Sequence, residues 1–170
     1  TKVSEQIFAF TPDSRYFVGN TPHGGYLMAI MNKALSSVMP HPSAINSNVY
    51  YLERTEPAET EIHVEILRTS IGSTMGQAKL IQDGKIRCLF SSLYSDFTYM
   101  KGYSGLGTPL PSIMHSVAEE EYKVMSYDIL KPGSTPSFIQ QLELSVHPQH
   151  AWWDREIASG ESEARCSGYI

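Results

Sequence analysis

Hydrophobic residues recur at helical spacing between residues 22 and 38. The repeating apolar positions, three or four residues apart, are Leu27, Ile30, Met31, Ala34, Leu35 and Val38. Polar side chains are few in this stretch. We therefore predict a helix with Thr21 as its N-cap and Pro22 at its first position, ending before Pro40 and buried on most of its sides.

Alternating hydrophobic and polar positions after residue 45 predict a series of antiparallel strands. We expect strands at residues 45–52, 62–67, 74–82 and 85–94, preceded by a first strand at 5–10. Asp83-Gly84 separates two of these runs and is a strong hairpin signal. One long helix beside antiparallel strands indicates an α+β domain whose sheet curls around the helix.

The remaining chain predicts a linker and further strands. Residues 97–136 are rich in glycine and turn formers, whereas apolar positions from Phe138 to Val146 and again over 164–170 suggest strands. Two strands do not bury a core alone, so they either join the first sheet or begin a second domain. We expect a first domain at 1–96, a linker at 97–136 and an incomplete second domain at 137–170.

The predicted helix begins with chemistry suited to an electron-rich oxygen. His23, Gly24 and Gly25 fill the first turn, although each glycine costs about 1 kcal/mol relative to alanine. Glycines are expected where something approaches the backbone closely, and the amides of a first turn attract a carboxylate, a phosphate or an oxyanion. The alternative is that the glycines only allow a neighbouring strand to pack against the helix start.

Composition narrows the function classes. The chain has 170 residues and a net charge of −5, with scattered Lys and Arg, which argues against nucleic-acid binding. No apolar run approaches the ~20 residues that span a bilayer, and no secretory signal pattern is present. Cys88 and Cys166 have neither metal-ligand nor disulfide-framework spacing. We expect reduced thiols, a cytoplasmic or other reducing intracellular location, and no metal or cofactor.

Residues Asn20 to Leu27 (Asn-Thr-Pro-His-Gly-Gly-Tyr-Leu), opening a buried helix, resemble the hot-dog fold. The later stretches Tyr51-Leu52, Val64 to Arg68 and Gln77 to Gly84 extend the likeness to the tandem-repeat, thioesterase II-like (TesB-like) acyl-CoA thioesterases. The resemblance covers residues 5–96. It implies that residues 137–170 are the opening strands of a second hot-dog repeat.

This resemblance implies hydrolysis of acyl-CoA or an acyl-carrier thioester. Gly24 and Gly25 would be the backbone oxyanion donors, with His23 beside them in the catalytic site. Asn20, Tyr26 and Gln77 would contact the substrate. A carboxylate would orient water, yet no Asp or Glu lies between Pro22 and Val38. The tandem family keeps its acid largely in the second repeat, and the sequence does not place Asp13, Asp96 or Asp154 near the pocket.

Other functions stay open. One is a non-catalytic acyl-binding or structural hot-dog protein that needs a partner or a complete second repeat. Another is a dehydratase of 3-hydroxyacyl thioesters, which needs a histidine facing an acid. His23 and Asn20 have structural interpretations as a cap and a turn residue, and Gln77 and Gln82 read as exposed strand residues. An open sheet edge in a single hot-dog unit predicts a homo-oligomer.

Overall fold

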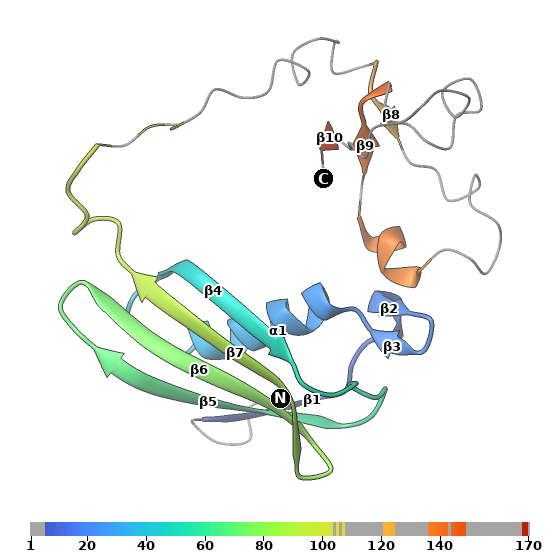
Figure 1. The fold of residues 1–170 in the computed structure, drawn as a ribbon, viewed down its shortest axis with the longest axis horizontal. Helices are drawn as coiled ribbons and strands as arrows, with labels where there is room; N and C mark the ends of the chain where they lie inside the picture. The colour runs from blue at the N-terminus through green and yellow to red at the C-terminus, as the bar shows by residue number, and fades with distance from the viewer. Residues whose placement is uncertain are drawn as a thin grey trace. The chain divides into compact units, whose positions relative to one another are not determined.

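The computed structural model describes residues 6–103, 105, 107, 121–124, 136–142, 144–148 and 168–169, in two compact units, Thr1–Gly102 and Tyr103–Ile170. In the first unit, five strands form one antiparallel sheet in the order β1-β5-β6-β7-β4 (Figure 1). The strands are β1 (Ile7–Phe10), β4 (Ser43–Tyr51), β5 (Thr60–Thr69), β6 (Ser73–Gln82) and β7 (Lys85–Ser95). The predicted α+β class is confirmed.

A tight hairpin joins β6 to β7 at the predicted place. Gln82 pairs with Lys85, and the two residues between them, Asp83 and Gly84, have φ angles of 51° and 69°. Positive φ at both central positions is the geometry of a type I′ turn, whose twist matches that of the flanking strands. The hairpin prediction is therefore confirmed by its backbone geometry.

The helix α1 (Gly24–Ser36) runs along one face of this sheet (Figure 1). Its buried residues pack against buried side chains of β5, β6 and β7, and these helix residues are Leu27, Met31, Ala34 and Leu35. Gly25, Ala29, Lys33 and Ser36 are exposed. The expected burial on most sides is therefore wrong for this unit, because its sheet covers only one side of the helix.

The helix starts later than predicted. Thr21–Pro22 form β3, which pairs with β2 (Phe17–Val18) after a short 3₁₀ helix, η1 (Ser14–Tyr16). The turn between them contains Gly19 with a φ of 61°. The predicted N-cap role of Thr21 is wrong because the strand pairing uses Thr21 and Pro22, so His23 becomes the N-cap residue.

The second unit contains a small three-stranded sheet in the order β10-β9-β8. Its strands are β8 (Lys123–Val124), β9 (Ser145–Val146) and β10 (Gly168–Tyr169). We expected a strand to begin at Phe138, but the chain forms a 3₁₀ helix there, η5 (Ser137–Gln141). That this unit is a second repeat stays a prediction, and Asp154 and Cys166 lie outside the described residues. Within the described part of the chain, no helix has the length and hydrophobicity to cross a bilayer.

Candidate functional site

A cavity of about 420 Å³ lies at the N-terminal end of α1. Its walls come from two parts of the first unit: β3 with the start of the helix, and the end of β4 with the loop that follows it. The lining residues are Thr21, Pro22, Gly24, Leu27, Tyr51, Leu52, Glu53, Arg54 and Thr55. Part of the predicted helix-start motif, with Gly24 among its residues, therefore borders this cavity.

The first-turn amides at this end have no partner within the helix. Leu27 N–H donates to His23 O at 3.1 Å, so the N–H groups of Gly24, Gly25 and Tyr26 precede the first intrahelical bond. The His23 side chain does not cap the helix. These amides give the end of the helix a partial positive charge that favours a negatively charged oxygen.

Each glycine has a close neighbour of its own. The Tyr51 hydroxyl donates to Gly24 O at 2.7 Å, and a Cβ on Gly24 would lie 2.9 Å from that hydroxyl oxygen. A Cβ on Gly25 would lie 3.1 Å from Cε1 of His23. The close approach of β4 to Gly24 matches the packing explanation that the sequence left open, and it coexists with the cavity beside the same residue.

The loop after β4 is bonded to neighbouring elements. The N–H groups of Leu52 and Glu53 both donate to Arg87 O of β7, and the Arg87 guanidinium pairs with the Glu53 carboxylate. The Arg54 guanidinium donates to Asn20 O in the β2–β3 turn at 3.2 Å. Contacts on both sides therefore fix the cavity wall to the sheet and to the segment before α1.

A buried glutamine secures the far half of this loop. Gln82 is 3% exposed, so the sequence-based interpretation of Gln82 as an exposed strand residue is wrong. It lies on the helix-facing side of β6, where its amide reaches inward to Glu56, Ala58 and Thr60. The hydrogen bonds of Gln82 therefore hold residues 56–60, which directly follow the cavity-wall residues 52–55.

The structure brings some of the predicted site residues together. Gly24 lines the cavity, His23 and Gly25 flank it at the start of α1, and the Asn20 carbonyl accepts from Arg54 of the cavity wall. Tyr26 instead stacks on Tyr16, with ring centroids 4.6 Å apart and planes 7° apart. Its hydroxyl oxygen accepts from the backbone N–H of Asp13. Tyr26 therefore anchors the segment before β2 and does not line this cavity.

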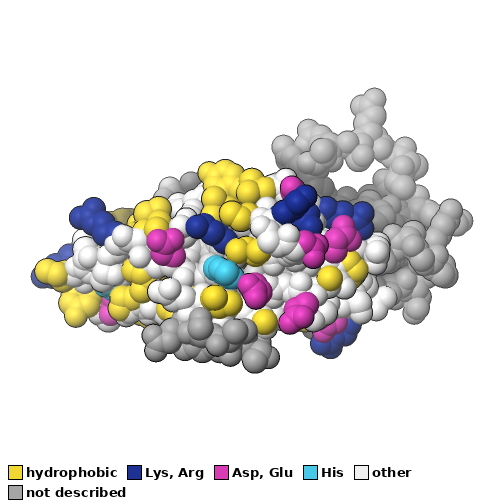
Figure 2. Space-filling view, turned by 90° about the horizontal axis from the view of Figure 1, so that it is seen from below, with side chains coloured by type: hydrophobic (Ala, Val, Ile, Leu, Met, Phe, Trp, Pro, Cys, Tyr) yellow, Lys and Arg dark blue, Asp and Glu magenta, His cyan; other side chains and the backbone are white. Residues whose placement is uncertain are grey.

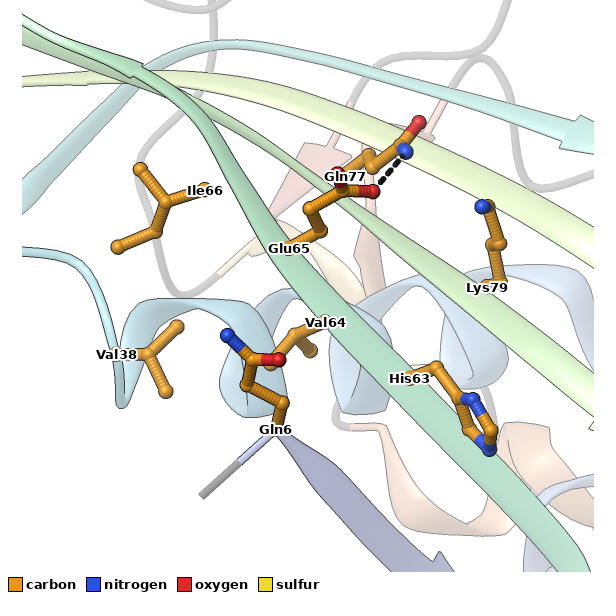
Figure 3. Close-up of a pocket in the computed structure, with 8 residues that line it drawn as sticks. All are labelled: Gln6, Val38, His63, Val64, Glu65, Ile66, Gln77 and Lys79. Atoms are coloured by element: carbon orange, nitrogen blue, oxygen red, sulfur yellow. Dashed lines mark hydrogen bonds between the residues drawn. The ribbon is translucent and has the colours of Figure 1, made fainter. Parts of the chain in front are cut away.

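Gln77 lines a different cavity, of about 800 Å³, beside β5 (Figure 3). Its side-chain Nε2 donates to Glu65 Oε2 at 2.7 Å, and Lys79 and His63 lie farther along the same strands. His63 is itself paired with Glu61. On the surface in Figure 2, basic, acidic and hydrophobic side chains are intermixed. The structure does not place Gln77 with the residues at the helix start.

Asp13 and Asp96, two carboxylates considered from the sequence, each form local contacts of their own. Asp13 forms an ion pair with Arg15, which holds the pKa of the Asp13 carboxyl below its ordinary value. Hydrogen bonds from the Thr98 side chain and from the Thr98 backbone N–H likewise lower the pKa of the Asp96 carboxyl. Neither residue lines the cavity at α1. No grouping of three His, Cys, Asp or Glu side chains fit to hold a metal occurs among the described residues.

Sequence reasoning missed Tyr51 and Glu53 as site residues. Glu53 is the acidic member of the cavity lining, and Tyr51 covers Gly24. Tyr51 is the last residue of β4, and Glu53 begins the charged pair Glu53-Arg54 just after the strand. That change from apolar to charged marks a strand end, but only the folded chain brings this end to the start of α1.

Comparison with known proteins gives one family and one fold. Residues 12–96 match the family model described as the acyl-CoA thioesterase N-terminal domain. No curated protein matches the chain. Among solved structures, the chain is similar to a protein from Thermobifida fusca YX, provisionally assigned as a thioesterase II, with a TM-score of 0.70 and 18% identity over 89% of this chain and 53% of that one.

A second similar structure is a hot-dog protein of unknown function from Alicyclobacillus acidocaldarius, with a TM-score of 0.69 and 15% identity over 83% of this chain and 50% of that one. A third, provisionally assigned as a thioesterase, is from Novosphingobium aromaticivorans DSM 12444; its TM-score is 0.62, at 15% identity over 86% of this chain and 57% of that one. The expected hot-dog fold is confirmed. The chain spans about half the length of these structures.

Proposed function

Because this chain belongs to the acyl-CoA thioesterase N-terminal domain family, we propose that it hydrolyses acyl thioesters, with acyl-CoA as the substrate class. The observation that carries this proposal is the cavity at the start of α1, where Gly24 lies in the wall and the His23 side chain does not cap the first-turn amides. The thioester carbonyl would enter this cavity with its oxygen toward those amides.

Thioester hydrolysis passes through an intermediate whose negatively charged oxygen must be stabilised. Water adds to the thioester carbonyl carbon, and the carbonyl oxygen becomes an oxyanion that accepts hydrogen bonds from Gly24 and Gly25 N–H. The tetrahedral intermediate then collapses, the carbon–sulfur bond breaks, and the thiolate takes up the proton that water lost. The products are a carboxylic acid and the free thiol of the carrier.

Two side chains are our candidates to handle the proton of water. Glu53 is a carboxylate in the cavity lining, and its ion pair with Arg87 fixes its position. His23 lies against Gly25 at the start of the helix. We assign the water-orienting role to Glu53, because a carboxylate within the cavity is suited to accept that proton, and keep His23 as the second candidate.

One observation favours an alternative without catalysis. The helix α1 contains no acidic residue, and the Glu53 carboxylate already forms an ion pair with Arg87. A domain in which no acid is available for water would bind the acyl thioester without cleaving it. Cleavage would then need a partner or a complete second hot-dog repeat.

We also propose that a second copy of this chain pairs along β4 and continues the sheet. In the first unit β4 is an outer strand of the sheet, and Ile45 along it is exposed. An exposed long edge strand is normally paired or covered. Sedimentation velocity on the full chain tests this assembly, and a stable monomer would exclude it.

The test of function compares Gly25→Pro with Gly25→Ala. Both variants carry a Cβ that meets His23, but only proline lacks the N–H. Hydrolysis is measured over a series of acyl-CoA chain lengths. We expect Gly25→Pro to lose roughly 100- to 1000-fold in kcat and Gly25→Ala to stay within a few-fold of the wild type. Equal activity of the two variants would exclude the oxyanion role.

A binding measurement separates the enzyme from the alternative. Calorimetric titration with a non-hydrolysable acyl-CoA thioether gives the affinity independently of turnover. Binding together with hydrolysis supports the thioesterase. Binding without hydrolysis supports the non-catalytic function, and absence of both excludes acyl-CoA as the substrate class.

A further inference from the structure

We propose that Tyr51 is a positioning residue that fixes the Gly24–Gly25 peptide and thereby aims the Gly25 N–H at the substrate oxygen. This inference rests on the proposed thioesterase function. It adds a residue from the end of β4, which reaches the helix start only in the folded chain. Tyr51 itself does not donate to the substrate in this proposal.

The geometry of one peptide unit carries the argument. The carbonyl of Gly24 and the N–H of Gly25 belong to the same planar peptide group. Holding the Gly24 oxygen in place therefore restrains the direction of the Gly25 N–H. The Tyr51 hydroxyl donates to Gly24 O at 2.7 Å. Rotation of this peptide away from its helical orientation would break that bond. Tyr51 therefore restrains the direction of the Gly25 N–H bond.

The same hydrogen bond strengthens the donor. A hydrogen bond accepted by an amide carbonyl polarises the amide and makes its N–H a better donor. Partial burial raises the pKa of the Tyr51 hydroxyl above its ordinary value of 10.0, and at neutral pH the group is protonated and able to donate. Tyr51 thus acts on the Gly25 amide both by direction and by polarisation.

Packing holds the tyrosine in place. The absence of a Cβ on Gly24 lets the hydroxyl end of the Tyr51 ring approach the helix backbone. Tyr51 also pairs with Cys88 in the register between β4 and β7, so its backbone belongs to the sheet. Tyr50 pairs with Leu89 and points to the opposite face, because side chains alternate along a strand. The chain therefore offers Tyr50 as a matched control.

The kinetic test compares Tyr51→Phe with Tyr50→Phe in the full chain. Each variant removes one hydroxyl from a half-exposed tyrosine of β4, since Tyr51 is 51% and Tyr50 is 59% exposed. We expect Tyr51→Phe to lower kcat for acyl-CoA hydrolysis roughly 3- to 10-fold, the effect of one hydrogen bond, with KM changed less than about 2-fold. Tyr50→Phe should match the wild type in both constants.

Several outcomes would overturn the proposal. An unchanged kcat in Tyr51→Phe would mean that the hydroxyl has no influence on the reaction. A rise in KM alone would mean that Tyr51 only contacts the bound substrate. Equal losses of kcat in both variants would point to a general effect on β4. Thermal unfolding of each variant shows whether the fold is intact before kinetics are compared.

A second measurement does not depend on activity. The amide ¹H and ¹⁵N resonances of Gly25 are recorded in the wild type and both variants. We expect a shift of the Gly25 resonance in Tyr51→Phe and none in Tyr50→Phe, whereas an unmoved Gly25 resonance overturns the proposal. If the wild type hydrolyses no acyl thioester, the proposed function fails while this spectrum still decides whether Tyr51 controls the Gly25 amide.

Discussion

The side chain of Gln82 bonds to both backbone polar groups of Glu56. Its Oε1 accepts from Glu56 N–H at 2.9 Å, and its Nε2 donates to Glu56 O at 2.9 Å. The same Nε2 lies 3.2 Å from Ala58 O and 2.8 Å from Thr60 Oγ1. One buried amide therefore satisfies backbone groups of the loop that begins with the cavity wall.

Replacing this amide should destabilise the first unit. Gln82→Leu removes the partner of the part-buried N–H and carbonyl of Glu56 and of Thr60 Oγ1, and each lost hydrogen bond of this kind contributes about 0.5–1.5 kcal/mol. We expect a loss of roughly 2–4 kcal/mol in the free energy of unfolding, measured by urea titration. The matched control is Gln77→Leu on the same strand, whose exposed bond to Glu65 should contribute less than about 0.5 kcal/mol. Similar losses in the two variants would contradict this account.

Gly76 is the place in β6 where added volume should be costly. A Cβ there would lie 3.0 Å from the backbone oxygen of Glu65 and 3.0 Å from Leu35 Cδ1, and would also meet the end of Met39. Because a backbone atom does not move aside easily, we expect Gly76→Ala to cost about 1–3 kcal/mol. Gly72→Ala meets nothing within 4 Å and should leave the thermal midpoint unchanged or raised. A stable Gly76→Ala variant would show that the helix and strand separate readily.

The proposed role of Glu53 predicts a loss of turnover without its carboxylate. Glu53→Gln keeps the side-chain size and still accepts a hydrogen bond from Arg87, but it is a poor base. We expect kcat for acyl-CoA hydrolysis to fall by about 100-fold or more, with the folded state retained. Glu56→Gln, which changes an exposed carboxylate paired with Arg54, is the control. Full activity of Glu53→Gln would place the catalytic acid elsewhere.

Stability should decline at alkaline pH. Burial raises the pKa of the Cys88 thiol above its ordinary value of 9.0 and that of the Tyr94 hydroxyl above its ordinary value of 10.0. When the pH rises through the ordinary values, the unfolded chain loses these protons first and binds fewer than the native state. The free energy of unfolding then falls with pH, whereas below about pH 8 this contribution is fully present.

Urea midpoints between pH 7 and about pH 10.5 test this dependence. Cys88→Ala should be less stable than the wild type at pH 7, because it leaves a small cavity, yet its midpoint should fall less steeply between about pH 8.5 and 10. Parallel pH profiles for the two proteins would show that Cys88 does not contribute to the alkaline decline.

Local patterns predicted the elements that depend on neighbouring residues. The alternation along β5, β6 and β7 and the Asp83-Gly84 turn define a hairpin and a half-buried sheet without reference to distant residues. The start of α1 was misplaced because Thr21-Pro22 suits a helix N-cap and first position as well as a strand. In the folded chain Thr21 pairs with Val18 and forms a strand. Helix propensity contains no information about that strand pairing.

The sequence predicts the part of the candidate site at the start of α1, but not the part at the end of β4. The two glycines stand out in the sequence by their cost to a helix, and His23 is contiguous with them. Tyr51 and Glu53 join them through the path of β4, so no spacing rule identifies them. Gln82 looked like an exposed strand residue, yet its strand position faces inward, where the loop after β4 supplies backbone partners.

All the residues that line the cavity at α1 fall within one continuous stretch, from Thr21 to Thr55. Arg87 on β7 bonds to Leu52 and Glu53 of that stretch, and Gln82 on β6 holds residues 56–60 directly after it. An engineer who transplants the stretch into another scaffold must carry this hairpin along with it. A graft without the hairpin would keep every residue that lines the cavity. It would lose the hydrogen bonds and the ion pair that hold the loop after β4 in position.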